Sequence, residues 1–213
     1  MENNPILLEL MERHPRLLPL RDEIAKAAEL LVLCFRNGGK LLVCGNGGSS
    51  SDSDHIAGEM MKGFVHSRRI NEKLRNALVA SGGERGAYLS EKLQQGLPSI
   101  SLSAHTALIT AIANDTDADL IFAQQVISYG KPGDVLMALS TSGNSRNVID
   151  AIITAKATDM IVIGLTGESG GKMSQLCDIL IAVPSEGTAF IQELHLPVYH
   201  AICRIVESEI FSE

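Results

Sequence analysis

Two pairs of polar side chains, far apart in the sequence, could together hold a metal ion or move protons. His55 and Glu59 are four residues apart in a segment expected to be helical, so both project from one face of that helix. Gln192 and His200 are separated by about 80° around the axis of an expected C-terminal helix, and they share a broad face. His195 lies elsewhere on that helix.

Imidazole, carboxylate and amide groups suit zinc among other divalent metals. Carboxylates and imidazoles also transfer protons in general acid–base catalysis. A single histidine on a helix more often has a structural part, so the grouping of His55, Glu59, Gln192 and His200 by itself leaves a packing role open.

Two loops rich in glycine and hydroxyl groups each follow an apolar run. GNGGSSS begins at Gly45, after the run KLLVC, and STSGNS spans Ser140 to Ser145, after the run DVLMAL. A helix is expected after each loop, and its N-terminal N–H groups and dipole favour an anion. Either loop alone could be a tight turn or a helix cap. The pair favours a phosphorylated ligand lying across both.

The known nucleotide-binding motifs fit these loops poorly. A Walker A loop needs GxxxxGK followed by Ser or Thr, and no lysine lies near either loop. The dinucleotide motif GxGxxG has Ser50 in its third glycine position here, and no acidic residue ends a second strand about 20 residues later. NAD binding is therefore not expected.

Short apolar segments alternate with helical patterns along the chain, which predicts a doubly wound α/β domain with a five-stranded parallel sheet covered on both faces. The expected strands cover residues 40–44, 97–103, 134–140, 160–166 and 178–184. The expected helices cover residues 5–36 with breaks near Pro15 and Pro19, 49–64, 70–95 as one or two helices, 105–113, 117–128, 146–157 and 187–211. Ligands of such sheets bind at the carboxyl ends of the strands, where both loops lie.

Composition limits the function classes. The chain has 213 residues, enough for one domain with a substantial core, and a formal net charge of −7 without a long basic run, which argues against a nucleic-acid partner. Its apolar runs are strand-sized and its N-terminus lacks the pattern of a secretory leader, so we expect a cytoplasmic protein without a membrane anchor. Four cysteines in apolar contexts and without metal-site spacing predict buried free thiols.

The sequence resembles the sugar isomerase (SIS) domain superfamily and, within it, the phosphoheptose isomerases. The resemblance covers nearly the whole chain and is carried by CGNGGSSSDSDHIAGE, ANDTDADLIFAQQV, GDVLMALSTSGNSRNVIDAI, IGLTGESGGKMSQLCDILIAVP and IQELHLPVYHAICRIVE. STSGNS alone marks only the superfamily. The glycine loop with its following His and Glu, together with IQE and the later His, is more specific.

The resemblance implies a single SIS domain over 1–213, a flavodoxin-like three-layer sandwich with N-terminal helices over 1–37. It implies interconversion of sedoheptulose 7-phosphate and D-glycero-D-manno-heptose 7-phosphate, with Glu59 as the base and His200 as its acid/base partner. It also implies one zinc ion per subunit on His55, Glu59, Gln192 and His200, and a homotetramer with active sites at subunit interfaces. The implied substrate-binding residues are Asn46, Gly47, Gly48, Ser49, Glu59, Asn114, Asp115, Ser140, Thr141, Ser142, Ser145 and Gln192.

The segment 66–97 departs from the family pattern, because typical members connect the same elements with a shorter segment. This extra helical piece could cover the active site, extend a subunit interface or change the accepted sugar. Two alternatives to the heptose isomerase therefore stay open: a non-catalytic SIS protein that senses a sugar phosphate or binds another protein, and an isomerase of another phosphosugar. The full set of His55, Glu59, Gln192 and His200 favours an enzyme, since an adaptor has no chemical need for it.

Overall fold

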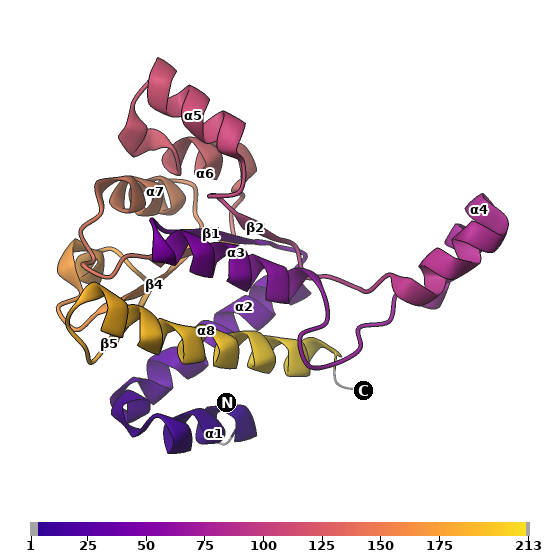
Figure 1. The fold of residues 1–213 in the computed structure, drawn as a ribbon, viewed down its shortest axis with the longest axis horizontal. Helices are drawn as coiled ribbons and strands as arrows, with labels where there is room; N and C mark the ends of the chain where they lie inside the picture. The colour runs from indigo at the N-terminus through magenta and orange to yellow at the C-terminus, as the bar shows by residue number, and fades with distance from the viewer. Residues whose placement is uncertain (1–3, 212–213) are drawn as a thin grey trace.

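The protein folds as a five-stranded parallel sheet covered by helices on both faces (Figure 1), as expected. The structure, a computed structural model, describes residues 4–211, so the ends of the expected N-terminal helical region and of the chain lie outside it. The strands are β1 (Leu41–Cys44), β2 (Ser99–Ser101), β3 (Val135–Leu139), β4 (Ile161–Gly167) and β5 (Ile179–Val183). Their order in the sheet is β2-β1-β3-β4-β5, the flavodoxin-like order.

Both faces of each central strand are buried, which explains why these strands read as continuous apolar runs. In β1, Leu41 and Val43 belong to one hydrophobic core, whereas Leu42 and Cys44 belong to the core on the other side of the sheet. The first core is closed by α1, α2, α3 and α8, and the second by α6 and α7. Successive side chains of a strand point to opposite faces, so each layer takes alternate residues.

The helices follow the predicted ranges closely. They are α1 (Pro5–Arg13), α2 (Arg21–Arg36), α3 (Gly48–Met61), α4 (Glu72–Lys92), α5 (Thr106–Asp115), α6 (Ala123–Tyr129), α7 (Arg146–Ala157) and α8 (Thr188–Phe211), with short 3₁₀ helices at Pro15–Leu20, Ala118–Leu120 and Gly171–Gln175. The predicted break near Pro15 and Pro19 is the first of these 3₁₀ helices. No helix within residues 4–211 is long and apolar enough to cross a membrane.

Several boundaries differ from prediction, and two of the differences have a clear local reason. Strand β2 is shorter than expected at both ends. Helix α3 ends at Met61 rather than residue 64, because Lys62 is extended with φ −139° and ψ 171°. The expected helix over 117–128 is divided, since the Asp117 side chain accepts a hydrogen bond from the Asp119 N–H and caps a 3₁₀ turn.

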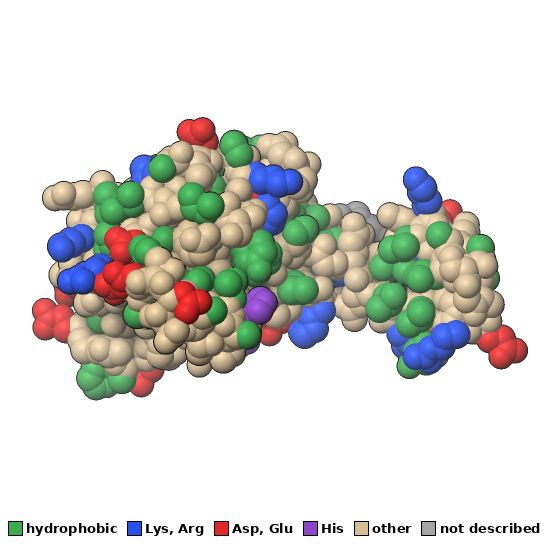
Figure 2. Space-filling view, turned by 90° about the horizontal axis from the view of Figure 1, so that it is seen from above, with side chains coloured by type: hydrophobic (Ala, Val, Ile, Leu, Met, Phe, Trp, Pro, Cys, Tyr) green, Lys and Arg blue, Asp and Glu red, His purple; other side chains and the backbone are tan. Residues whose placement is uncertain are grey.

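The extra helical segment forms an arm that projects from the body (Figure 1). Gly83 breaks α4 with φ 52° and ψ −126°, and a Cβ on Gly86 would lie 1.9 Å from the Leu78 carbonyl oxygen, so the two halves of the arm pack backbone to backbone. Figure 2 shows the arm as a separate lobe with hydrophobic side chains on its surface. Its exposed large hydrophobic residues include Leu74, Val79 and Tyr88.

All four cysteines are free, and three of them are buried. Burial raises the pKa of the Cys44, Cys177 and Cys203 thiols to about 12, and that of Cys34 to about 11. Because the thiolate is the reactive form, we expect native protein at pH 8 to react slowly with a thiol-specific dye, and four thiols to react after unfolding in guanidinium. One fast-reacting thiol in the native protein would contradict this account.

Candidate active site

Glycines shape the loop after β1 and allow the last helix, α8, to pack closely against it. Gly47 has φ 57°, which side chains other than hydrogen rarely tolerate. A Cβ on Gly48 would lie 2.6 to 2.8 Å from the Gln192 side-chain amide. The absence of a side chain at Gly48 therefore lets Gln192 of α8 pack directly against the start of α3.

His55, Glu59 and His200 meet between α3 and α8. His55 Nε2 lies 3.2 Å from Glu59 Oε1, as the four-residue spacing on α3 predicts. The His55 and His200 rings are 4.9 Å apart between centroids and nearly perpendicular. Lys62 Nζ donates to Glu59 Oε2 over 3.3 Å. Glu59 and His200, which are 141 positions apart in the sequence, thus lie close together with His55 in one site.

Two residues that the sequence analysis left out extend this cluster. The Tyr199 hydroxyl donates to Asp52 Oδ1 over 3.1 Å and lies 3.1 Å from His55 Nδ1. Burial raises the pKa of both Tyr199 and Asp52. Asp52 lies one helical turn before His55, and Tyr199 directly precedes His200, so their spacing was the available signal. Together they hold the His55 ring from the side opposite Glu59.

The Nε2 atom of His200 has no protein partner. His200 Nε2 is buried without a hydrogen bond, and burial lowers the pKa of this imidazole, with His55 adding to the effect. A buried neutral imidazole nitrogen beside a second histidine and a carboxylate is the kind of donor that zinc takes. Within residues 4–211 no group of three or more His, Cys, Asp or Glu side chains is spaced to hold a metal, and the His55–Glu59 contact engages one donor atom of each.

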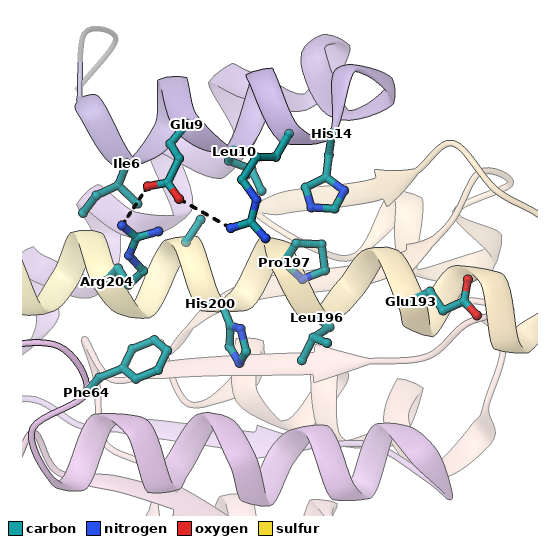
Figure 3. A pocket seen from close by; sticks show the side chains of 12 residues that line it. Ile6, Glu9, Leu10, His14, Phe64, Glu193, Leu196, Pro197, His200 and Arg204 are labelled. Carbon is teal, nitrogen blue, oxygen red and sulfur yellow. Dashed lines mark hydrogen bonds and ion pairs between the residues drawn. The ribbon is translucent and has the colours of Figure 1, made fainter.

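Figure 3 shows His200 on the side of α8 that faces α3. His200 is among the residues of α1 and α8 that line a cavity of about 280 Å³. Glu9 lies on the α1 side of this cavity and is paired with Arg204 and Arg13. The single Glu9 carboxylate offsets only one of the two positive charges of these arginines. His195, in contrast, is fully buried with Nε2 3.2 Å from the Thr166 carbonyl oxygen, which gives it a packing role.

The loop after β3 is held by the loop after β4. Ser140 Oγ and Ser145 Oγ are 3.0 Å apart, and Ser145 precedes the first residue of α7. Gly143 has φ 64°, and a Cβ there would lie 2.2 Å from the Gly170 carbonyl oxygen. Gly170 and Gly171 also have positive φ, and a Cβ on Gly171 would lie 2.4 Å from the Ser142 carbonyl oxygen. The sequence analysis did not identify this close approach of the glycine pair after β4 to the loop after β3.

The two loops flank the point where the strand order reverses, between β1 and β3. The first loop contacts the first turn of α7 through an exposed pair of side-chain amides: Asn46 donates to Asn147 Oδ1 over 2.8 Å, and Asn147 donates back to Asn46 Oδ1 over 2.9 Å. Thr141 and Ser142 line a cleft of about 300 Å³ that reaches the N-terminus of α8 at Thr188. Hydroxyl groups and helix N-termini thus surround the carboxyl edge of the sheet.

Two predicted substrate-binding residues lie apart from this group. Asn114 and Asp115 end α5 and are exposed, and the hydrogen bond found for them within the described part of the chain joins them to each other over 2.8 Å. Ser49, in contrast, is buried in the first turn of α3. Most of the predicted set therefore lies around α3, α8 and the two loops, whereas Asn114 and Asp115 on α5 lie apart from it.

Comparison with known proteins gives consistent matches. A family model described as the SIS domain matches residues 12–95 and 87–167. The phosphoheptose isomerase of Rhodospirillum rubrum is 42% identical over 189 residues, which are 89% of this chain and 87% of the relative. The solved phosphoheptose isomerase of Neisseria gonorrhoeae has a TM-score of 0.74 and 36% identity, covering 94% of both chains. That of Francisella tularensis has a TM-score of 0.72 and 34% identity, covering 88% of this chain and 86% of the other.

Proposed function

This chain belongs to the phosphoheptose isomerase family of SIS-domain proteins, and from that membership we propose that it interconverts sedoheptulose 7-phosphate and D-glycero-D-manno-heptose 7-phosphate. The observation that carries the proposal is the convergence of Glu59, His55 and His200 beside the glycine loop that opens α3. The reaction exchanges a ketose and an aldose through an enediol. It requires a base, an acid and a binding site for the phosphate.

The Glu59 carboxylate removes a proton from C1 of the ketose and returns it to C2. His200 accepts the proton of the C1 hydroxyl and donates a proton to the C2 oxygen, so atoms and charge balance. The lowered pKa of His200 keeps the imidazole neutral near pH 7, able to accept a proton before giving it back. His55 contacts Tyr199 through Nδ1 and Glu59 through Nε2, and it thereby orients the Glu59 carboxylate.

The phosphate of the sugar is bound by the loop from Ser140 to Ser145. Uncharged hydroxyl donors and the N-terminal end of α7 favour an anion at this position. Asn46 and the backbone around Gly47 and Gly48 contact the sugar hydroxyls, and Gln192 reaches the same place from α8. Asn114 and Asp115 are part of the proposed substrate-binding set by family membership, although α5 lies apart from the other members within one chain.

Zinc is part of the proposal, one ion per subunit, held by His55, Glu59, Gln192 and His200. The unpaired buried Nε2 of His200 and the donor types of the other three side chains support it. A bound zinc would polarise the sugar carbonyl and stabilise the developing oxyanion. The residues that move the protons remain those of the protein.

Zinc binding has its own test. Protein treated with a chelator should bind one zinc per chain in isothermal titration calorimetry, and His200→Asn should weaken binding by at least about tenfold. The matched control is His105→Asn, which changes the exposed histidine that caps the N-terminus of α5. Equal zinc affinity of wild type and His200→Asn would remove the metal from the proposal.

We further propose a homotetramer in the cytoplasm. Exposed apolar residues on the body, such as Leu18 and Phe190, support association, and four free cysteines suit a reducing compartment. Light scattering after size exclusion tests the assembly, since a 22.8 kDa particle at working concentration would contradict it.

The function is tested by turnover of a panel of sugar phosphates. We expect kcat/KM for sedoheptulose 7-phosphate to exceed that for fructose 6-phosphate and for amino-sugar phosphates. Preference for a six-carbon substrate would support the proposed reaction type but contradict the proposed seven-carbon substrate. Tight binding of sugar phosphates without turnover would favour the sensor or adaptor function instead.

A further inference from the structure

An ion pair between Arg68 and Glu207 is completely buried beside the candidate active site. Arg68 Nε donates to Glu207 Oε1 over 2.7 Å, and both side chains have 0% exposure. Charges removed from water in this way persist only when hydrogen bonds satisfy the remaining polar atoms. The partners that satisfy them show what the pair holds in place.

Glu207 organises the chain that leaves α3. Its carboxylate accepts backbone N–H hydrogen bonds from Phe64 over 2.8 Å, Val65 over 2.8 Å and His66 over 3.1 Å. Glu207 stands on α8, so these bonds fix the segment after α3 to that helix. The position of this segment is set by one side chain and not by packing alone.

Arg68 holds the last turn of α3 itself. Nη2 donates to the Glu59 carbonyl oxygen over 3.0 Å, and Nη1 donates to that of Met60. Carbonyl groups at a helix C-terminus lack partners within the helix and carry its negative pole, so a guanidinium there is favourable. Arg68 also lies over the Phe211 ring, 4.8 Å from its centroid.

The pair joins the two helices that carry the proton-transfer groups. Glu59 stands on α3, while His200 and Glu207 are seven residues apart on α8, nearly in line along one face. We infer that Arg68 and Glu207 are positioning residues that hold the last turn of α3 against α8, and thereby set Glu59 against His200. This inference rests on the proposed function.

The test compares Glu207→Gln with a control at a second ion pair whose carboxylate is buried. Asp134→Asn disturbs the Lys40–Asp134 pair, whose carboxylate also accepts backbone N–H bonds, from Lys40 and Lys131. That pair precedes β1 and β3, at the end of the sheet opposite the site. Both variants should lower the melting temperature.

Only Glu207→Gln should lower kcat on sedoheptulose 7-phosphate, by about 10- to 100-fold with KM within about twofold, because small displacements of catalytic groups slow turnover. Arg68→Lys keeps the positive charge but loses the planar guanidinium group with its several N–H donors. If Glu207→Gln fails to fold, Arg68→Lys should show the same lowered kcat with nearly unchanged KM. Equal kcat in wild type and in every folded variant would overturn the inference.

A readout without turnover separates this inference from the proposed function. With ¹³C-labelled histidine, the NMR signals of His55 and His200 should shift in Glu207→Gln and Arg68→Lys and stay in place in Asp134→Asn. If wild type turned over no sugar phosphate, the proposed function would fail while these shifts still supported the positioning. Unchanged histidine signals in both folded variants would overturn the positioning even if wild type were active.

Discussion

Replacing Glu59 by Gln should lower kcat on sedoheptulose 7-phosphate by about 10²–10⁴-fold, the usual contribution of a general base. The amide keeps the size of the side chain but cannot accept the C1 proton. Substrate affinity, measured by calorimetry, should change far less than kcat, since the hydroxyl loops that we propose to bind the phosphate are untouched. The comparison of kcat with affinity assigns Glu59 to proton transfer.

The control is Glu193→Gln, which removes a carboxylate from the cavity that also contains His200. It should leave kcat within about threefold of wild type. Both variants should melt near the wild-type temperature, because the Glu59 side chain contributes only its contacts to His55 and Lys62. Retention of more than about a tenth of wild-type kcat by Glu59→Gln would assign the base to another residue.

Replacing Gly143 by Ala should damage both stability and substrate binding. The new Cβ would lie 2.2 Å from the Gly170 carbonyl oxygen, at a φ of 64° that disfavours side chains. Backbone strain and steric overlap together should cost roughly 2–4 kcal/mol of unfolding free energy, measured by urea denaturation. The displaced loop should also raise KM by about tenfold, the loss of one charge-assisted hydrogen bond to the phosphate.

The matched variant is Gly133→Ala. Gly133 has φ 84°, yet a Cβ there meets nothing within 4 Å, and it lies before β3 at the far end of the sheet. It should lose about 1–2 kcal/mol from backbone strain and keep its KM. Similar losses of stability and unchanged KM in both variants would mean that the contact between Gly143 and Gly170 does not shape the binding loop.

The layered fold could be predicted because its signals are local. Buried strands such as Val135–Leu139 are short apolar runs bounded by turn residues, and α7 begins and ends where its periodic pattern does. Boundaries were less certain where one side chain decides the conformation, as Asp117 does when it caps its 3₁₀ turn. The shape of the arm depends on Gly83, whose unusual φ and ψ reverse the chain.

The site could be predicted in part. The spacing of His55 and Glu59 on one helix fixes their contact, but the approach of His200 depends on how α8 packs against α3. Arg68 falls within the segment that departs from the family pattern, and nothing near it in sequence indicates a partner 139 residues away. Likewise, Gly170 approaches the Ser140–Ser145 loop because β3 and β4 are neighbours in the sheet, which the local sequence does not indicate.

The most direct test of the proposed isomerisation is proton NMR of wild-type protein with sedoheptulose 7-phosphate in D₂O, with and without added zinc. The account predicts new aldose anomeric signals, with deuterium at C2 because the proton held by Glu59 exchanges with solvent. Glu59→Gln should abolish both. Absence of aldose both with and without zinc would contradict the proposed isomerisation, and aldose that fully retains the transferred hydrogen would contradict exchange of the proton held by Glu59 with solvent.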